Sequence, residues 1–431
     1  MSRHASIRSS LKAFFGDARL AAALTTTALG LGVFAFALER MIGEAGLIAM
    51  LVTLVPLCAG SLIARRATVE WLAVVPISML VFLGWATLSV FWSQYRQETL
   101  GGVAYLLAFT ALGLMVALTR DTIQIIRAAG DVLRATLGLS LALEVLSGLL
   151  IDVPIAFLDI RGHIARGGPI QGIVGSHHEV GLLAVIAGIT FTIEWRTQSI
   201  SRGLAVGSLA AAGLTLLLAR SPVSFGTAAV AITATAVLYG VRRLKPAQRT
   251  FWQLAILGAA ALIALAVWML RSPIVTALNA TGDLNLRLRL WQQVWALVPL
   301  HPLEGWGWIG QWDAGISPFS LFNTVSRQTL TSAANAYLDV WFQLGLVGIA
   351  AFVGMLALAF ARSWLLGARQ RSVVYTWPAV VLAALMTSAL AESSILYEFG
   401  WLVFVVCCVK ASQRLSWRNA FQRPLEQDPL T

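Results

Sequence analysis

Long apolar runs separated by short polar stretches dominate this chain. Twelve of these runs are long enough to cross roughly 30 Å of hydrocarbon as helices. They lie near residues 20–38, 45–63, 71–92, 100–118, 133–150, 173–193, 203–219, 223–241, 252–270, 337–361, 373–395 and 397–411. Alternation of apolar and polar residues is not sustained, which argues against membrane-spanning strands. The pattern predicts an all-α, polytopic membrane helical bundle with about 12 transmembrane helices, and residues 1–431 form a single domain.

The longest polar interval, residues 271–336, follows the ninth apolar run. It combines arginines, tryptophans, glycine-rich turns and a helix start in one loop between spans 9 and 10. A shorter polar loop, residues 151–172, precedes the sixth run on the same predicted side. Binding and catalytic residues concentrate in loops that a rigid scaffold positions. We therefore expect residues 271–336 to form an extracytoplasmic active-site loop.

The composition supports residence in a membrane. The chain is 58% hydrophobic and 12% charged, whereas a soluble domain carries roughly 25% charged residues. Its net charge of +11 indicates contact with anionic lipid headgroups rather than nucleic acid, because no soluble segment interleaves basic and stacking aromatic residues. Cys58, Cys407 and Cys408 lie in apolar runs without metal-site spacing and are expected to be small buried residues.

Basic residues predict the side of the membrane that each loop occupies, because cytoplasmic loops are enriched in Lys and Arg. This rule makes both termini cytoplasmic, with residues 1–19 before an uncleaved first span and residues 412–431 as a tail. Every lysine then lies inside. The basic residues outside are all arginines, namely Arg40, Arg96, Arg161, Arg166, Arg220, Arg271, Arg287, Arg289 and Arg327. A planar guanidinium suits bidentate phosphate contacts.

The outer loop contains a stretch that predicts an amphipathic helix capped by Asp283. Arg287 and Trp291 are four residues apart and share a face of that helix. Arg289 lies about 200° around the helix from Arg287, so one site is not expected to receive both. The arginines either extend toward the lipid interface or, in the case of Arg287, bind a diphosphate.

Residues 301–310 form a glycine-rich turn that contains Glu304, Trp306 and Trp308. Its formal GxGxxG pattern does not predict a dinucleotide site, because no strand precedes it and tryptophans fill variable positions. The tryptophans are typical of an aromatic belt at the membrane interface. Their ring faces also suit sugars.

Two short outer segments place polar residues at the ends of spans. Pro222 disfavours helix continuation at Ser221 and leaves Arg220 at the membrane surface, where an arginine usually has an anionic partner. A purely structural role is the alternative for Arg220. His178 and Glu179 begin the sixth span, either as a polar cavity wall or as an ordinary helix start. No second ligand cluster supports a metal site there.

Asn335 is a good helix N-cap directly before Tyr337 and Asp339. Its role is either capping alone or, because a helix N-terminus at the membrane surface attracts anions, contact with an anionic substrate. Glu392 and Glu398 bracket the last outer turn. They suit either an interface position or a functional carboxylate.

In their order and spacing, these motifs resemble the O-antigen ligase/polymerase family of bacterial polytopic membrane glycosyltransferases. The family's outer loop begins with Arg-x-x-x-Trp, continues with Pro and Gly-x-Gly, and ends with His-Asn, an aromatic-Leu pair and Gly-Leu-x-Gly. The matching positions are Arg287, Trp291, Pro302, Gly305, Gly307, Asn335, Tyr337-Leu338 and Gly345-Leu346-Val347-Gly348. Arg220 matches a further arginine at an earlier outer turn. The resemblance covers about residues 172–401.

The resemblance implies a metal-independent, inverting glycosyltransferase of the bacterial cytoplasmic (inner) membrane that needs no cofactor. The donor would be a polyprenyl-diphosphate-linked glycan, with undecaprenyl as the lipid, and the acceptor a saccharide or glycolipid on the outer side. Catalytic roles are expected for Arg220, Arg287, His178 and Glu179. Substrate binding is expected for Arg161, Arg166, Arg289, Glu304, Trp291, Asn335 and Tyr337. Ligase and polymerase activity, and the oligomeric state, stay open.

The chain departs from the family at the histidine before Asn335, which here is Ala334. Alanine cannot accept a proton, so the base is elsewhere, or the position carries an inactivating substitution, or the chain is a divergent or inactive member. Candidate bases are His178, Glu179, Glu304 and Asp339. The alternative functions are a transporter or flippase of lipid-linked oligosaccharide and a non-catalytic scaffold.

Overall fold

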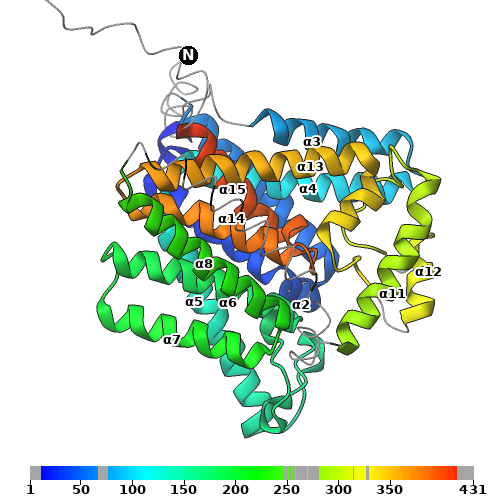
Figure 1. The fold of residues 1–431 in the computed structure, drawn as a ribbon, viewed down its shortest axis with the longest axis horizontal. Coiled ribbons are helices and arrows are strands. Elements are labelled where there is room, and N and C mark those ends of the chain that lie inside the picture. Colours follow the sequence, from blue (N-terminus) through cyan, green and yellow to red (C-terminus); the bar gives the residue numbers. More distant parts are fainter. Residues whose placement is uncertain are drawn as a thin grey trace, which may run out of the picture.

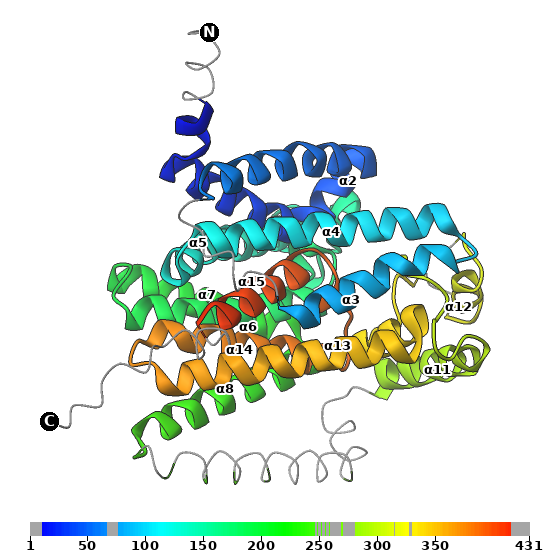
Figure 2. The same ribbon diagram turned by 90° about the horizontal axis from the view of Figure 1, so that it is seen from above.

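The computed structural model describes residues 11–66, 76–245, 281–313, 315–326 and 330–414, together with positions 248, 251, 255, 258 and 269. The α-helices there are α2 (Ala18–Ala64), α3 (Ile77–Leu88), α4 (Arg96–Thr119), α5 (Thr122–Val145), α6 (His177–Arg196), α7 (Arg202–Ala219), α8 (Pro222–Arg243), α11 (Thr281–Leu297), α12 (Phe319–Ser326), α13 (Ala336–Arg369), α14 (Trp377–Ser388) and α15 (Glu398–Arg414). They form a bundle with α11 and α12 at one end (Figure 1, Figure 2). The all-helical prediction is confirmed for this part of the chain.

Seven of the described helices are long and apolar enough to cross a membrane. They are α2, α4, α5 with its extension to Leu150, α6, α7, α8 and α13. Two shorter apolar helices cover Ile77–Phe91 and Val373–Ser388. The predicted number of twelve is not confirmed, because the predicted span 252–270 lies outside the described residues except at positions 255, 258 and 269. The loop segment 271–280 also lies outside them.

The first two predicted spans, 20–38 and 45–63, are the two halves of α2. The chain departs from helical geometry at Gly43, where φ is +77° and ψ is 168°, a conformation that glycine adopts without steric cost. The guanidinium of Arg65 donates a 3.1 Å hydrogen bond to the carbonyl of Gly16. The two ends of α2 therefore lie together, and the element is a helical hairpin.

Helix α15 is the centre of the bundle. Every side chain from Trp401 to Val409 is buried, and the helix packs against α2, α4, α13 and α14 (Figure 2). A helix that is apolar on all sides belongs in a core rather than at a lipid surface. Cys407 and Cys408 are buried there as free thiols, as is Cys58 in α2, which confirms the prediction for the cysteines.

Loops that were predicted on the same side meet at the same end of the bundle. At the outer-loop end, Arg40 forms a 3.1 Å ion pair with Asp159, and Tyr105 donates a 3.0 Å hydrogen bond to Glu398. At the opposite end, Arg242 donates to the carbonyl of Arg371. The contacts thus group the loops as the distribution of basic residues predicts.

Helix α13 is interrupted at Gly345, where φ is +66° and ψ is −166°. An unbroken helix would bond the carbonyls of residues 342 and 343 to the amides of residues 346 and 347. A Cβ atom at Gly345 would lie 2.2 Å from the carbonyl oxygen of Leu303. Glycine is therefore required at the break by both its backbone angles and the close approach of the outer loop.

The glycine-rich turn of the outer loop replaces the hydrogen bonds that the break removes. The bonds run from the amides of Trp306 and Gly307 to the carbonyls of Phe342 and Gln343, at 3.1 and 2.8 Å, and from the amides of Leu346 and Val347 to the carbonyls of Pro302 and Leu303, at 2.9 and 3.3 Å. Buried backbone polar groups need such partners. The turn is thus part of the helical scaffold that carries the loop.

Candidate active site

The guanidinium of Arg287 joins α11 to three other segments at the outer-loop end. One terminal nitrogen donates to the carbonyl oxygens of Ala334, at 3.3 Å, and Ala391. The other lies 2.7 Å from Oε1 of Glu392 and 3.1 Å from Nε2 of His178. The side chain is 13% exposed. Arginine has five N–H donors, and most of those of Arg287 are directed at protein atoms, so its charge is fixed in position.

His178 uses both nitrogens of its ring. Nδ1 lies 2.7 Å from the hydroxyl of Ser221, and Nε2 faces Arg287. A guanidinium can only donate, so Nε2 accepts from Arg287, and the remaining proton of the neutral ring is on Nδ1, which donates to Ser221. The two contacts fix the orientation of the imidazole between the first turn of α6 and the first turn of α8.

Arg220 lies in the turn between α7 and α8, with φ +48° and ψ 32°. Ser221 caps α8 by accepting a 3.1 Å hydrogen bond from the amide of Ser224, and Pro222 is the first residue of that helix. The helix break predicted before Pro222 is confirmed. The Arg220 side chain is exposed, and in the described part of the chain it has no hydrogen bond or ion pair.

The outer loop 151–172 lies against this turn. The amide of Ile170 donates a 3.1 Å hydrogen bond to the carbonyl of Leu218, and a Cβ atom at Gly167 would lie 3.3 Å from a terminal nitrogen of Arg220. Arg166 directly precedes Gly167. Arg161 and Arg166 are both exposed, without a hydrogen bond or ion pair among the described residues.

Glu179 follows His178 in the first turn of α6 and is half-buried. It interacts electrostatically with both Glu392 and Glu398. Within the described residues its carboxylate makes no hydrogen bond or ion pair. A carboxylate next to the arginine cluster therefore has oxygens free to accept a proton or a hydrogen bond.

The shared face predicted for Arg287 and Trp291 is confirmed. Nε1 of Trp291 donates a 2.8 Å hydrogen bond to the carbonyl of Ala333, next to the carbonyl that Arg287 contacts. Arg289 is exposed and donates to the carbonyl of Asn285, within its own helix, at 3.3 Å. The helix begins at Thr281, so Asp283 lies inside it and not at its cap; the polar residues before Asp283 continue the helical backbone.

Asn335 caps α13, as predicted. Its side-chain oxygen accepts hydrogen bonds from the amides of Tyr337 and Leu338, both at 3.1 Å. Its side-chain nitrogen donates to the carbonyl of Leu390 at 3.1 Å. The hydroxyl of Tyr337 donates to the carbonyl of Met386 at 3.2 Å. Asn335 thus holds α13 against the turn that follows α14, and Tyr337 holds it against the last turns of α14 itself.

Asp339 and Gln343 extend the polar face of α13 that begins at Asn335, since the three residues are spaced four apart. The buried Asp339 carboxylate accepts from the amide of Ala333 at 3.1 Å and from the hydroxyl of Ser393. Gln343 accepts from the amide of Gly310 at 3.1 Å and donates to the carbonyl of that residue at 3.0 Å. These side chains position the outer loop.

Ala334 stands directly before the N-cap Asn335, where the motif pattern of the sequence led us to expect a histidine. It has φ +48°, and its carbonyl accepts from Arg287. The position therefore borders the arginine cluster. Positive φ is uncommon for residues other than glycine and is several-fold enriched for Asn, Asp and His. The alanine methyl group supplies no polar atom to the site.

Glu304 lies in the turn that completes α13. Its Oε1 is 3.0 Å from Nδ1 of His301, and this hydrogen bond holds the pKa of Glu304 below its usual range. Its carbonyl accepts a 3.1 Å hydrogen bond from Nε1 of Trp92. No interaction among the described residues joins Glu304 to the cluster of Arg287 and His178.

The sequence motifs did not single out two residues that contact Arg287 and His178, namely Glu392 and Ser221. Glu392 pairs with Arg287, although its place at an outer turn suited an interface position equally well. Ser221 bonds to His178, although its place before Pro222 indicated only a helix start. Their roles depend on contacts across long sequence separations, and no local pattern signals them. Arg271 and Arg327 lie outside the described residues. In the described part, no group of three or more His, Cys, Asp or Glu side chains is placed to hold a metal ion.

Comparison with known families gives one match. Residues 207–353 match the family model described as O-antigen ligase, and this segment contains Arg220, Arg287 and Ala334. A comparison with curated proteins finds no match. The family match favours neither the transporter nor the non-catalytic interpretation. The resemblance indicated by the motifs is thus confirmed by a match to the O-antigen ligase family over residues 207–353 of this multi-span membrane protein.

Proposed function

We propose that the protein transfers a glycan from a polyprenyl-diphosphate-linked donor to a saccharide or lipid acceptor. The observation that supports this most strongly is the hydrogen-bonded chain from Arg287 through His178 to Ser221, which ends next to Arg220. The chain thereby connects the guanidinium of Arg287 to the turn that carries Arg220. The site lies at the outer-loop end of the bundle, which we assign to the outer side of the bacterial cytoplasmic membrane.

Arg220 is the arginine best suited to bind the diphosphate. It is exposed and has no hydrogen bond or ion pair among the described residues, so all its donors are available for a bidentate contact. Arg166, beside Gly167, can add a second cation from the neighbouring loop. Arg287 is already compensated by Glu392 at 2.7 Å. Its role is to hold His178 and to contribute positive potential toward the leaving group.

The reaction is an inverting displacement at the anomeric carbon. The acceptor oxygen forms a bond to that carbon while the bond from the carbon to the diphosphate oxygen breaks. The electron pair of the broken bond leaves with the diphosphate, whose charge the arginines stabilise. Fixed cations that face developing charge are worth roughly a hundred- to a thousandfold in rate, so this step does not require a metal ion.

Glu179 is the group we assign to take the proton of the acceptor hydroxyl. Ala334 cannot do so. His178 is excluded as the base because both of its ring nitrogens form hydrogen bonds. Asp339 is excluded because it is buried and accepts from two protein donors. Glu304 is excluded because it lies in the turn that completes α13, away from Arg287. The Glu179 carboxylate has no hydrogen bond or ion pair in the described part of the chain and follows His178 directly. Geometry decides the choice of a general base before its acidity does.

Purified protein in nanodiscs, supplied with a polyprenyl-diphosphate-linked saccharide and an acceptor, tests this function. Arg220→Ala should lower transfer roughly a hundredfold or more. Arg289→Ala should leave it near the wild-type rate, contrary to the substrate contact expected from the sequence, because Arg289 lies about 200° around α11 from Arg287. Both variants should melt like the wild type. Equal rates for the two variants would refute the proposed role of Arg220.

A further inference from the structure

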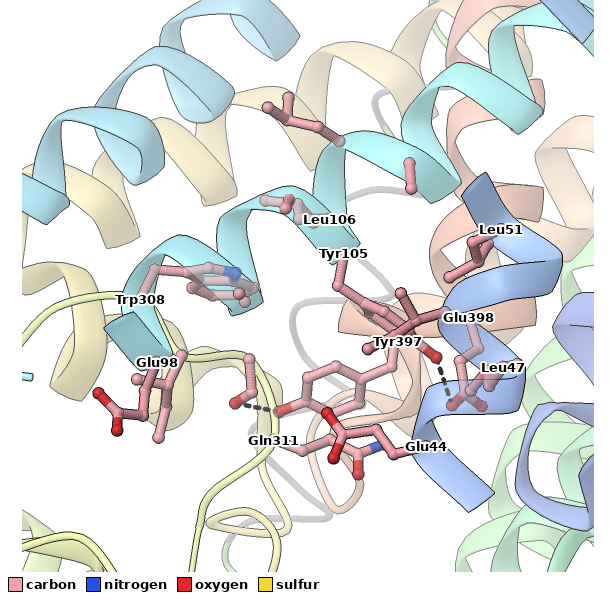
Figure 3. A pocket seen from close by; sticks show the side chains of 18 of the residues that line it. Glu44, Leu47, Leu51, Glu98, Tyr105, Leu106, Trp308, Gln311, Tyr397 and Glu398 are labelled. Carbon is pink, nitrogen blue, oxygen red and sulfur yellow. Dashed lines mark hydrogen bonds between the residues drawn. The ribbon is translucent and has the colours of Figure 1, made fainter. Parts of the chain in front are cut away.

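A cavity of about 1170 Å³ lies at the outer-loop end, away from Arg220 and Arg287. Its walls are the second half of α2, residues 97–108 of α4 and residues 308–313 of the outer loop (Figure 3). Tyr105 and Tyr397 cross its floor, and their hydroxyls bond to Glu398 and to the carbonyl of Gly310. None of the residues assigned above to donor binding lines it.

The cavity has the depth of one membrane leaflet. Its lining on α4 runs from Gln97 to Ala108, and at 1.5 Å per residue this covers roughly 15 Å, half of the roughly 30 Å of hydrocarbon in a bilayer. The deep part is apolar, with Leu51 and Val55 from α2. Ile48 and Val52 also line the cavity and are 46% and 66% exposed. The cavity therefore borders the lipid-facing surface of α2.

The charged residues that line the cavity are acidic. The carboxylates that line it are Glu39, Glu44, Glu98, Asp313 and Glu398, and no Lys or Arg is among the described lining residues. Trp308 also lines the cavity, and its indole N–H is buried without a hydrogen-bond partner in the described part of the chain.

We propose that this cavity binds the acceptor, as a lipid-linked saccharide whose head is rich in hydroxyl groups and free of phosphate. The apolar depth suits a hydrocarbon chain of the outer leaflet. The carboxylates accept hydrogen bonds from sugar hydroxyls, and they repel the diphosphate of the donor. Because of these charges, the donor binds at the arginines and the acceptor binds at the carboxylates. This assignment rests on the proposed transfer function.

The turn between α14 and α15 borders both places. Its residues Ala391 and Glu392 contact Arg287, whereas Tyr397 and Glu398 line the cavity. Glu179 is near enough to both Glu392 and Glu398 for their like charges to act on its carboxylate. An acceptor hydroxyl that reaches from the cavity mouth toward the arginines therefore passes the carboxylate assigned as base.

Native mass spectrometry of the purified protein, titrated with monoglucosyl diacylglycerol or with phosphatidylglycerol of the same chains, tests the cavity without any donor. Wild-type protein should bind the glucolipid more tightly. Ile48→Trp, which fills the mouth, should weaken this binding roughly tenfold or more. Leu80→Trp on α3, at a comparably exposed aliphatic position (55%), is the matched control and should bind like the wild type.

The double substitution Glu44→Gln with Glu98→Gln should abolish the preference for the neutral lipid, because charge-assisted hydrogen bonds to the carboxylates are lost. A wild-type preference for phosphatidylglycerol, or equal binding by Ile48→Trp and Leu80→Trp, would overturn the proposal. The transfer function is judged separately by Arg220→Ala. If that variant transfers normally while Ile48→Trp loses the glucolipid, the arginine mechanism fails and the cavity stands.

Discussion

Nε2 of His178 lies 3.1 Å from the guanidinium of Arg287, although the two residues are 109 positions apart. The contact brings the first turn of α6 to the outer-loop helix α11. Nδ1 of the same ring reaches Ser221, next to Arg220. The imidazole thus connects Arg287 to the turn that carries Arg220.

Removal of the Arg287 side chain should disrupt this arrangement. Arg287→Ala leaves Glu392 without its 2.7 Å partner and removes the hydrogen bond to Nε2 of His178, so transfer should fall roughly a hundredfold or more. Arg287→Lys should recover little, because one ammonium group cannot reach the same set of acceptors. Initial rates of transfer measure both effects. Full activity in Arg287→Ala, with Arg289→Ala as the control, would rule out the arrangement.

Glu179→Gln should lower the transfer rate roughly a hundredfold while donor binding stays unchanged, because an amide cannot take a proton. His178→Asn, which alters the positioning residue, should weaken transfer less. The measurement is kcat and KM for each variant with the same donor and acceptor. If Glu179→Gln changes KM alone, Glu179 binds the acceptor and the base is another group.

Gly345 should not tolerate a side chain. Gly345→Ala puts a residue with a Cβ at φ +66°, which costs about 1–3 kcal/mol, and directs the methyl toward the carbonyl of Leu303 at 2.2 Å. Gly354→Ala in the same helix meets nothing within 4 Å and should be neutral or slightly stabilising. Thermal melting in detergent compares the two. Equal melting temperatures for Gly345→Ala and Gly354→Ala would mean that the packing of the outer loop against the α13 break does not contribute to stability.

The pair of His301 and Glu304 should make the glycine-rich turn sensitive to acid. Its hydrogen bond lowers the pKa of Glu304 from the ordinary value of 4.5. The pair therefore adds stability above that value and loses it as the pH falls through the lowered pKa. Exchange of the Trp306 and Gly307 amides, corrected for intrinsic rates, should accelerate as the pH falls below 4.5 and through the lowered pKa. In Glu304→Gln this acceleration should disappear; if it persists, another group titrates.

The helical bundle was predictable because its signal is local. Apolar runs, the N-cap at Asn335 and the break before Pro222 each depend on residues within a few positions of one another. The shared face of Arg287 and Trp291 follows from helical spacing. The start of α11 was misplaced, because a capping residue such as Asp283 is also tolerated in a first helical turn.

The composition of the site was only partly predictable, because its contacts join distant segments. Glu392 reaches Arg287, and Ser221 reaches His178, only after several helices have packed. The exchange of hydrogen bonds between residues 302–307 and the α13 break depends likewise on tertiary structure. The Gly-x-Gly motif predicted the turn. Neither the turn nor the segment around Gly345 predicts by itself that the two form hydrogen bonds with each other.

The most direct test of the account is a structure of the protein with a polyprenyl-diphosphate-linked saccharide bound. We predict that the diphosphate oxygens lie within about 3 Å of the Arg220 guanidinium, on the side that faces His178, with the cavity of Glu98 and Glu398 free of phosphate. A diphosphate in that acidic cavity, with Arg220 and Arg287 untouched, would contradict the account.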